Sequence, residues 1–442
     1  MADNIFAPGF KTDPYWWDAA PRPKLELAPL PAESDVVIVG SGYTGTSAAL
    51  TLARAGRKAL ILEAEDPGYG ASSRNAGYVG RMLWHKFGPL ERKLGPAAAA
   101  KLADDAVESH RYLTTLIEQE QIACGYVNCS RFIGARTQGH FDHFAEDLAM
   151  FARVGLNIQA DMIPRSAQGK EIGSEKFYGG MLLHGTGSLH PGLYHLGLLD
   201  RARRSGAGIA AHARVTGIER GKDGKFTVHT ERGNVRANDV IVATNAYSDK
   251  GVGWYRRRLV PVKLFQVATE PLSPQSLNRL MPGGRTLIDS LMNITWIRLS
   301  PDNTRLIIGG RTGVEEGGAK GKALKLHADA SEIFPELADV KLTHSWEGQC
   351  AFSFDKLPHI GVHDGVNYAM GYCGVGLPMA TWMGHRLGLK LLGKAEGATP
   401  FDGRRFPTRP FYNGEPWFLP AMMAYYDFKD RIELWRGERP RP

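Results

Sequence analysis

The first regular pattern in the chain is a pair of short apolar runs with a helical pattern between them. Residues 34–39 and 58–62 are mostly apolar, and 44–55 carries apolar residues at helical spacing. Short apolar runs predict buried strands, and the periodicity between them predicts a helix. The segment 34–62 is therefore expected to form one βαβ unit with parallel strands.

Helical patterns return further along the chain. Residues 90–121 are expected to form one long amphipathic helix or a pair, and another helix is expected from Pro191, with a glycine after its end. A helical pattern also follows the glycines of 371–376, so a second helix N-terminus could face a ligand. The aromatic-rich segment 415–435 is expected to dock on the body of the protein, rather than to contact a partner or a membrane surface.

Strand patterns fill two further stretches. In 213–248, short runs alternate with turn signals and end in the apolar run 240–243, which is expected to return to the sheet of the βαβ unit. From 256 to 312 the pattern is antiparallel, as expected of a separate sheet that presents a substrate face. The first domain is therefore expected to be discontinuous.

The turn inside the βαβ unit has the spacing G-x-G-x-x-G. Gly40 allows the tight turn, Gly42 lets a pyrophosphate approach the backbone, and Gly45 lets the helix pack closely on the strand. Glu63 ends the second strand, where its carboxylate can accept hydrogen bonds from both ribose hydroxyls and would repel a 2′-phosphate. The pattern predicts an adenine dinucleotide other than NADP, with FAD and NAD both open.

Composition and charge narrow the class of protein. With 442 residues, 43% of them hydrophobic, the chain can hold two or three domains. The 54 basic and 46 acidic residues give a net charge of +8, but the basic residues are dispersed, so nucleic acid is not expected as a partner. The four cysteines lack metal-ligand spacing, and no metal is expected. The chain shows no run of about 18 uncharged apolar residues and no signal-like start, which predicts a cytoplasmic protein without a transmembrane segment.

Five motifs then occur in the order of a known family. They are "VVIVGSGYTGTSAALTLARAG" with Glu63, "GASSRNAGYV" from Gly70, "LHPGLYHLGLL" from Leu189, "DVIVATNAY" from Asp239 and "GYCGVGLPMATWMG" from Gly371. With them the chain resembles the FAD-dependent amine oxidoreductases of the D-amino-acid oxidase and sarcosine oxidase superfamily, especially its gamma-glutamylputrescine oxidase-like branch. The resemblance covers most of the chain and favours FAD over NAD.

The resemblance implies an α/β (α+β) fold of two domains. A discontinuous, Rossmann-like FAD-binding domain is expected together with an antiparallel-sheet substrate domain. The expected segments are an N-terminal arm (1–33), three parts of the FAD-binding domain (34–110, 181–250 and 345–398), a helical substrate region (111–180), the antiparallel substrate sheet (251–344) and a tail with an amphipathic helix (399–442).

The resemblance also places residues at the cofactor. The second motif lies along the flavin in that family, and small residues there let backbone N–H groups reach the ring while a guanidinium balances phosphate charge. In this motif the implied contacts are Ser72, Ser73, Arg74, Asn75 and Gly77. Elsewhere they are Val215, whose backbone would meet adenine, Ala243, and the turn glycines Gly374 and Gly376.

In that family the flavin accepts a hydride from the carbon next to an amine nitrogen, and the imine hydrolyses in water. The resemblance therefore implies a small-molecule substrate that is a secondary amine, a polyamine or a gamma-glutamyl amine. No general base is expected, because the flavin carries the electron chemistry. Two alternatives are open: a flavin dehydrogenase or oxidase for a D-amino acid or hydroxy acid, and an RNA-directed or non-catalytic flavin-binding protein.

Two positions depart from the sarcosine oxidases and one agrees with them. Pro378 stands where they have a lysine for the substrate carboxylate, which disfavours small N-methylated α-amino acids. Ile307 stands where they have a lysine that helps oxygen react, so the electron acceptor, oxygen or another compound, is left open. Cys350 falls where they bind the flavin through a thioether, which makes covalent FAD a hypothesis; the alternative is an inert buried thiol.

Residues of the second sheet are candidates for the substrate pocket. Trp296, Trp346 and Phe352 could wall an apolar amine pocket, because a cation can rest on an indole face; the alternative is that the tryptophans are core. Arg298 and Arg311 could bind a distant carboxylate, or lie at the surface as strand-end arginines.

Overall fold

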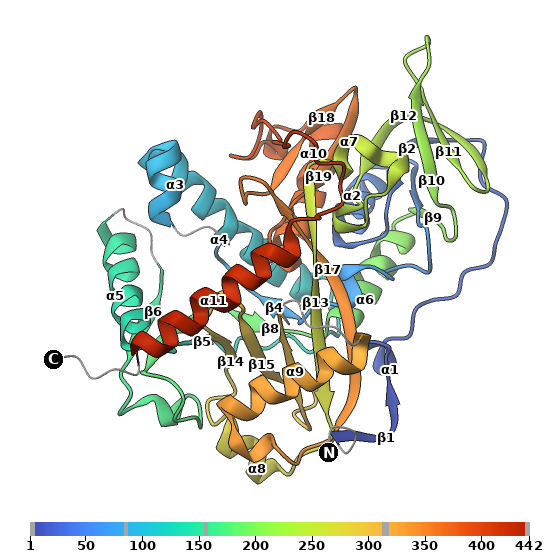
Figure 1. Ribbon diagram of the computed structural model, residues 1–442. Coiled ribbons are helices and arrows are strands. Elements are labelled where there is room, and N and C mark those ends of the chain that lie inside the picture. The colour runs from blue at the N-terminus through green and yellow to red at the C-terminus, as the bar shows by residue number, and fades with distance from the viewer. Residues whose placement is uncertain (1–4, 84–86, 154–157, 312–317, 438–442) are drawn as a thin grey trace.

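A computed structural model describes residues 5–83, 87–153, 158–311 and 318–437 of the chain (Figure 1). Within these residues the strands form two large sheets and a two-stranded ribbon of β4 (Tyr78–Val79) and β8 (Gly187–Ser188). Each large sheet has its own hydrophobic core. The predicted fold class, two domains with a Rossmann-like part and a substrate sheet, is confirmed.

The first sheet contains the predicted βαβ unit. Its strands lie in the order β10-β11-β12-β2-β3-β9, with β19 paired to β12 and β18 paired to β19. β12 pairs in parallel with β2, so the predicted return of the chain to this sheet is confirmed. The bounds are β2 (Glu33–Val39), β3 (Ala59–Leu62), β9 (Gly208–Ala210), β10 (Val215–Arg220), β11 (Phe226–Thr230), β12 (Gly233–Val242), β18 (His359–His363) and β19 (Val366–Met370).

Three helices cover this sheet. Helix α2 (Tyr43–Arg54) packs between α6 (Pro191–Arg204) and α10 (Gly376–Leu391). Gly384 of α10 allows the two helices to approach closely, since a Cβ at this position would lie 2.2 Å from the Thr44 carbonyl oxygen of α2. The helices predicted after residue 190 and after the glycines of 371–376 are thus confirmed.

The second sheet has nine strands, in the order β1-β17-β13-β16-β15-β14-β5-β7-β6. Most pairs are antiparallel, but β1 with β17 and β14 with β5 are parallel, so the sheet is mixed. Helices α8 (Pro274–Leu280) and α9 (Gly318–Ile333) belong to the same core. The bounds are β1 (Phe6–Lys11), β5 (Arg131–Gly134), β6 (Ala160–Ile163), β7 (Gly180–Leu183), β13 (Leu259–Thr269), β14 (Thr286–Asp289), β15 (Thr295–Leu299), β16 (Leu306–Gly310) and β17 (Leu342–Ser353).

This sheet draws on more of the chain than the segment 251–344 expected from the sequence. The N-terminal arm supplies β1, the region expected to be helical (111–180) supplies β5, β6 and the first residue of β7, and the rest of β7 comes from the segment expected in the FAD-binding domain. The expected boundary at residue 345 falls inside β17. The physical reason is that short strands far apart in sequence meet only through sheet pairing, which leaves no local signal.

The remaining helices lie outside the two sheets. The predicted 90–121 helix is a pair, α3 (Phe87–Leu94) and α4 (Pro96–Gln119), because Gly95 has a φ of +81° and Pro96 begins the second helix. The C-terminal helix α11 (Leu419–Gly437) docks on the β14–β15 loop, as predicted. The others are α1 (Trp16–Ala19), α5 (Gln138–Arg153) and α7 (Gly253–Arg256). No helix in the described ranges has the length and apolarity needed to span a membrane.

Candidate functional site

A cavity of about 670 Å³ is lined by residues of both sheets. Gly40, Gly42, Glu63, Val215 and Ala243 line one region of it, here called the nucleotide end. A second region, here called the sheet wall, consists of Ile133, Ile288 and Trp296 on adjacent strands of the nine-stranded sheet. The cavity therefore joins the predicted dinucleotide turn to the predicted substrate sheet.

The glycines of the turn have the geometry that the spacing predicts. Gly40 has a φ of +100°, and a Cβ there would lie 3.3 Å from the Ala243 carbonyl oxygen. A Cβ at Gly45 would lie 2.0 Å from the Gly40 carbonyl oxygen, which no side chain can satisfy. Gly42 is the N-cap of α2 and lines the cavity, so the helix N-terminus faces it and the N-cap residue itself adds no side chain there. This backbone cradle fits a pyrophosphate.

Glu63 directly follows β3 and lines the nucleotide end. Its Oε2 accepts hydrogen bonds from the Ser41 backbone N–H at 2.9 Å and from the Ser41 hydroxyl at 2.5 Å. Its Oε1 accepts one from the Glu65 N–H at 3.1 Å. The carboxylate is therefore held at the cavity, in the position from which a ribose can be bound.

A buried pair beneath the turn was not foreseen from the sequence. The Nε2 of His195 lies 2.7 Å from the Ser41 carbonyl oxygen, and its Nδ1 lies 3.2 Å from Nη1 of Arg22. Since a guanidinium only donates, Nδ1 accepts and Nε2–H donates, which fixes a neutral imidazole. Burial lowers the pKa of His195 to about 4. His195 stands inside the quoted "LHPGLYHLGLL" motif, but Arg22 comes from the N-terminal arm and carries no local signal.

The segment 70–77 splits into residues that line the cavity and residues that do not. Ser72, Arg74 and Asn75 line it, and the Ser72 hydroxyl accepts from the Tyr43 N–H at 2.9 Å. Ser73 is buried outside the lining, where its hydroxyl donates to the Gly68 carbonyl at 2.6 Å. The structure therefore places Ser73 in support of the loop and the other three at the cavity.

Gly77 and Gly45 also lie outside the lining and act through packing. A Cβ at Gly77 would lie 2.1 Å from the Leu189 carbonyl oxygen and 2.5 Å from Nη1 of Arg298. That Nη1 donates to the carbonyls of Ala76, Gly77 and Leu189 at 2.8–3.2 Å. Arg298 is thus buried beneath the 70–77 segment, which it supports through these hydrogen bonds, and it lies outside the lining of the cavity.

The remaining aromatic candidates are divided in the same way. Trp296 and Phe352 line the cavity, whereas Trp346 is 2% exposed and packs on Trp16, with ring centroids 6.0 Å apart. The Trp346 indole N–H donates to the Arg74 carbonyl at 2.9 Å. The core alternative therefore describes Trp346 in this structure, because the N-terminal arm covers it.

The turn that follows β19 also reaches the cavity. Gly374 and Gly376 line it, together with Cys350 of β17. Burial raises the pKa of the Cys350 thiol to about 11, although Arg311 and a hydrogen bond from the Gly374 backbone oppose the shift. The thiol is therefore protonated at neutral pH.

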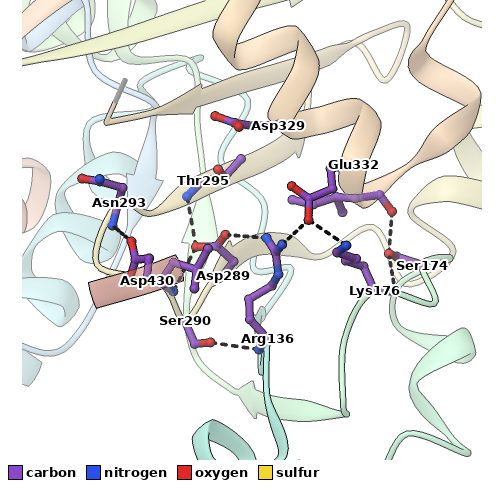
Figure 2. A network of polar contacts seen from close by, with 12 residues as sticks. Arg136, Ser174, Lys176, Asp289, Ser290, Asn293, Thr295, Asp329, Glu332 and Asp430 are labelled. Atoms are coloured by element: carbon purple, nitrogen blue, oxygen red, sulfur yellow. Dashed lines mark hydrogen bonds and ion pairs between the residues drawn. The ribbon is translucent and has the colours of Figure 1, made fainter. Parts of the chain in front are cut away.

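A polar network supports the loop between β14 and β15 from outside (Figure 2). Asp430 of α11 accepts from the N–H groups of Met292 and Asn293, both at 2.9 Å. Asp289, at the end of β14, forms an ion pair with Arg136 at 3.3 Å. This loop leads to Ile294, which lines the cavity, so α11 fixes one of its edges.

The glycine cradle, the placed carboxylate and the adjoining wall define a dinucleotide-dependent enzyme site. A family model described as FAD dependent oxidoreductase (DAO) matches residues 35–388, and the chain belongs to this family. The predictions of an FAD-dependent oxidoreductase, of the class acting on CH–NH or CH–NH2 bonds, are thereby confirmed.

Individual relatives and structures agree with this assignment. The chain is 31% identical over 405 residues to "Gamma-glutamylputrescine oxidoreductase" of Escherichia coli (strain K12), covering 90% of this chain and 93% of that protein. It is 28% identical over 435 residues to "Probable oxidoreductase OrdL" of Rhizobium meliloti (strain 1021), covering 96% and 98%. Its fold is similar to that of glycine oxidase from Geobacillus kaustophilus, with a TM-score of 0.72 at 21% identity, covering 86% and 99%.

Proposed function

We propose that this protein oxidises a C–N bond of a small-molecule amine, namely a secondary amine, a polyamine or a gamma-glutamyl amine. The chemistry that FAD would supply when bound is acceptance of a hydride from the carbon next to the amine nitrogen. The imine then hydrolyses to a carbonyl compound and an amine. No side chain needs to act as a general base if the amine enters unprotonated.

The residues of the nucleotide end would hold the FAD. The backbone of the Gly40–Gly42 turn and the N-terminus of α2 would meet the pyrophosphate, and Glu63 would bind the ribose of the adenosine. Val215 and Ala243 line the same region. These roles match the groups that the site offers, which are backbone N–H donors for phosphate oxygens and a carboxylate that accepts from ribose hydroxyls.

The observation that carries the choice of substrate is the sheet wall. Its indole and aliphatic side chains face the same cavity as Gly374 and suit the methylene chain of an amine. Pro378, in the first turn of α10, supplies no charge for an α-carboxylate. The similarity to a gamma-glutamylputrescine oxidoreductase supports the same choice.

Two finer properties belong to this proposal. Cys350 lines the cavity and is a candidate for a covalent bond to the flavin; release of all yellow colour on acid denaturation would exclude that bond. Ile307 is fully buried against Trp16 and Trp346, and it presents no cation that would help oxygen react. The electron acceptor is oxygen or another oxidant. The rate at which air restores the flavin colour of the reduced enzyme distinguishes the two.

Anaerobic reduction tests the proposal. The holoenzyme is mixed with secondary amines, polyamines, gamma-glutamyl amines, D-amino acids and hydroxy acids, and the visible absorbance of the flavin is followed. Bleaching by an amine that lacks an α-carboxylate is expected. Bleaching by D-amino acids or hydroxy acids alone would replace the proposal with the oxidase or dehydrogenase alternative, and no bleaching at all would contradict the proposed substrate class and favour the RNA-directed alternative.

A further inference from the structure

The sheet wall continues into a charged position. Trp296 of β15 pairs with Ile288 of β14, which pairs with Ile133 of β5, and all three line the cavity. Side chains two residues apart on a strand share a face, so Arg131 belongs to the same face as Ile133. Arg131 indeed lines the cavity. The apolar wall therefore has a guanidinium at the edge away from Trp296.

This guanidinium has no counter-ion among the described residues. Its side chain makes no hydrogen bond or ion pair with them, and its buried Nε has no partner. The ionisable groups that affect its pKa are Tyr78 and Cys129, with no carboxylate, and burial lowers that pKa. Two other arginines on the neighbouring chain segments are paired, Arg136 with Asp289 and Arg285 with Glu171. A partly buried, unpaired cation costs stability, which a bound anion would offset.

Tyr78 orients the guanidinium of Arg131. The guanidinium carbon lies 5.1 Å from the centroid of the Tyr78 ring. The Tyr78 hydroxyl donates to the carbonyls of Leu287 and Ile297, at 3.1 and 2.9 Å, which fixes that ring. The guanidinium therefore rests on an oriented aromatic face.

Gly80 leaves room beside the guanidinium. A Cβ at Gly80 would meet only the two terminal nitrogens of Arg131 within 4 Å, each at 3.8 Å. Gly80 itself lines the cavity. Both terminal nitrogens are thus close to open cavity space, and paired N–H donors of this kind match a carboxylate.

We propose that Arg131 binds a carboxylate at the far end of the amine substrate. This inference rests on the proposed oxidation of an amine. Two strand spacings and two residues along β5 separate Arg131 from Trp296 by roughly 12 Å of sheet. The substrate class is then a chain with its oxidised C–N bond near Trp296 and its acid group several bonds away, as in a gamma-glutamyl amine. Arg311 is less suited, because it already donates to the Met292 carbonyl at 3.2 Å.

Two probes that differ in one group test this role. N-glutarylputrescine ends in a carboxylate, and N-pentanoylputrescine has a methyl group in its place. Flavin reduction by each is measured for the wild type, Arg131→Met and Arg131→Lys. The preference for the glutaryl amine is expected to fall on the order of 100-fold in Arg131→Met and less in Arg131→Lys. Arg279→Met, which removes an exposed arginine paired with Glu336, is the matched control and should keep the preference.

A second variant and a binding assay distinguish loss of the carboxylate site from misfolding of the protein. Gly80→Leu fills the space beside the guanidinium and should lower the same preference without removing a charge. Flavin content and the thermal midpoint report whether each variant folds. Glutarate binding, followed by its perturbation of the flavin spectrum, does not require turnover and should be lost in Arg131→Met.

The outcomes separate the two proposals. If the wild type is reduced by both amines and Arg131→Met keeps the preference, the anchor is wrong while amine oxidation stands. If no amine of the wider panel reduces the flavin but glutarate binding depends on Arg131, the carboxylate site at Arg131 stands, whereas amine oxidation, and with it the assignment of that site to an amine substrate, is wrong. Glutarate binding that is equal in wild type and Arg131→Met overturns the anchor.

Discussion

The nucleotide end and the sheet wall line one cavity, but they are built in opposite ways. The nucleotide end presents mainly backbone from a short turn, in which a Cβ at Gly45 would meet the Gly40 carbonyl at 2.0 Å. The sheet wall presents side chains from β5, β14 and β15, which are joined only by pairing across the sheet. The first region admits almost no change, whereas the second can change one side chain at a time; in the proposed function, the first holds the cofactor and the second contacts the substrate.

The largest effect on the nucleotide end is expected from adding a side chain at the turn. Gly45→Val is expected to abolish FAD binding, because overpacking against the Gly40 carbonyl costs about 3 kcal/mol or more. The ratio of visible to protein absorbance after purification measures the bound flavin. Gly253→Ala is the control, since a Cβ there meets nothing within 4 Å and its φ is −58°. A yellow Gly45→Val protein would contradict the packing argument.

A pH series tests the histidine beneath the turn. The pKa of His195 is about 4 in the folded protein and about 6.5 when unfolded, so between these values the unfolded state binds the extra proton. Stability that is complete above pH 6.5 should therefore fall as the pH drops toward 4, by about 3 kcal/mol. His195→Asn keeps a neutral donor and acceptor and should flatten part of this loss, measured by denaturant unfolding at several pH values. Identical slopes for both proteins would rule out this role.

Glu63→Gln tests the one carboxylate side chain that is proposed to bind the cofactor at the nucleotide end. The amide keeps the shape but removes the charge that accepts hydrogen bonds from Ser41 and, in the proposal, from ribose. FAD affinity is expected to fall by about 2 kcal/mol, roughly 30-fold. Titration of the apoprotein by flavin fluorescence measures it, and unchanged affinity would remove Glu63 from the ribose site.

The smallest expected effect concerns the outer support of the sheet wall. Asp430→Ala removes the acceptor of the Met292 and Asn293 N–H groups and should loosen the loop before Ile294. KM for the amine is expected to rise several-fold, corresponding to about 1 kcal/mol, with flavin content unchanged. The exposed Arg431 on the same helix supplies the control variant, Arg431→Ala. Loss of flavin in Asp430→Ala would show that the two regions are not separate.

The contrast between the regions also decides what could be predicted from the sequence. The turn, α2 and the flanking strands are encoded by consecutive residues, so the spacing of Gly40, Gly42 and Gly45 was enough to place them. Arg298 was harder, because it shares a strand face with Trp296 and only the covering 76–77 segment distinguishes the two. Arg131 carried no signal at all, since its place depends on the parallel pairing of β5 with β14.

Trp346 of β17 is a second residue whose burial could not be predicted from its strand face alone. It shares a face with Cys350 and Phe352, which line the cavity, but Trp16 of the N-terminal arm covers it. The periodicity of a strand predicts which residues share a face. It does not predict which part of that face another segment will bury.

Isotope substitution provides a direct test of the proposed oxidation of an amine at its C–N bond. The holoenzyme is mixed anaerobically with a gamma-glutamyl amine carrying either hydrogen or deuterium on the carbon next to the reacting nitrogen, and the rate of flavin bleaching is recorded. Bleaching is expected to be slower with deuterium and to yield the matching aldehyde after imine hydrolysis. A flavin that stays oxidised with this amine but is bleached by hydroxy acids would contradict it.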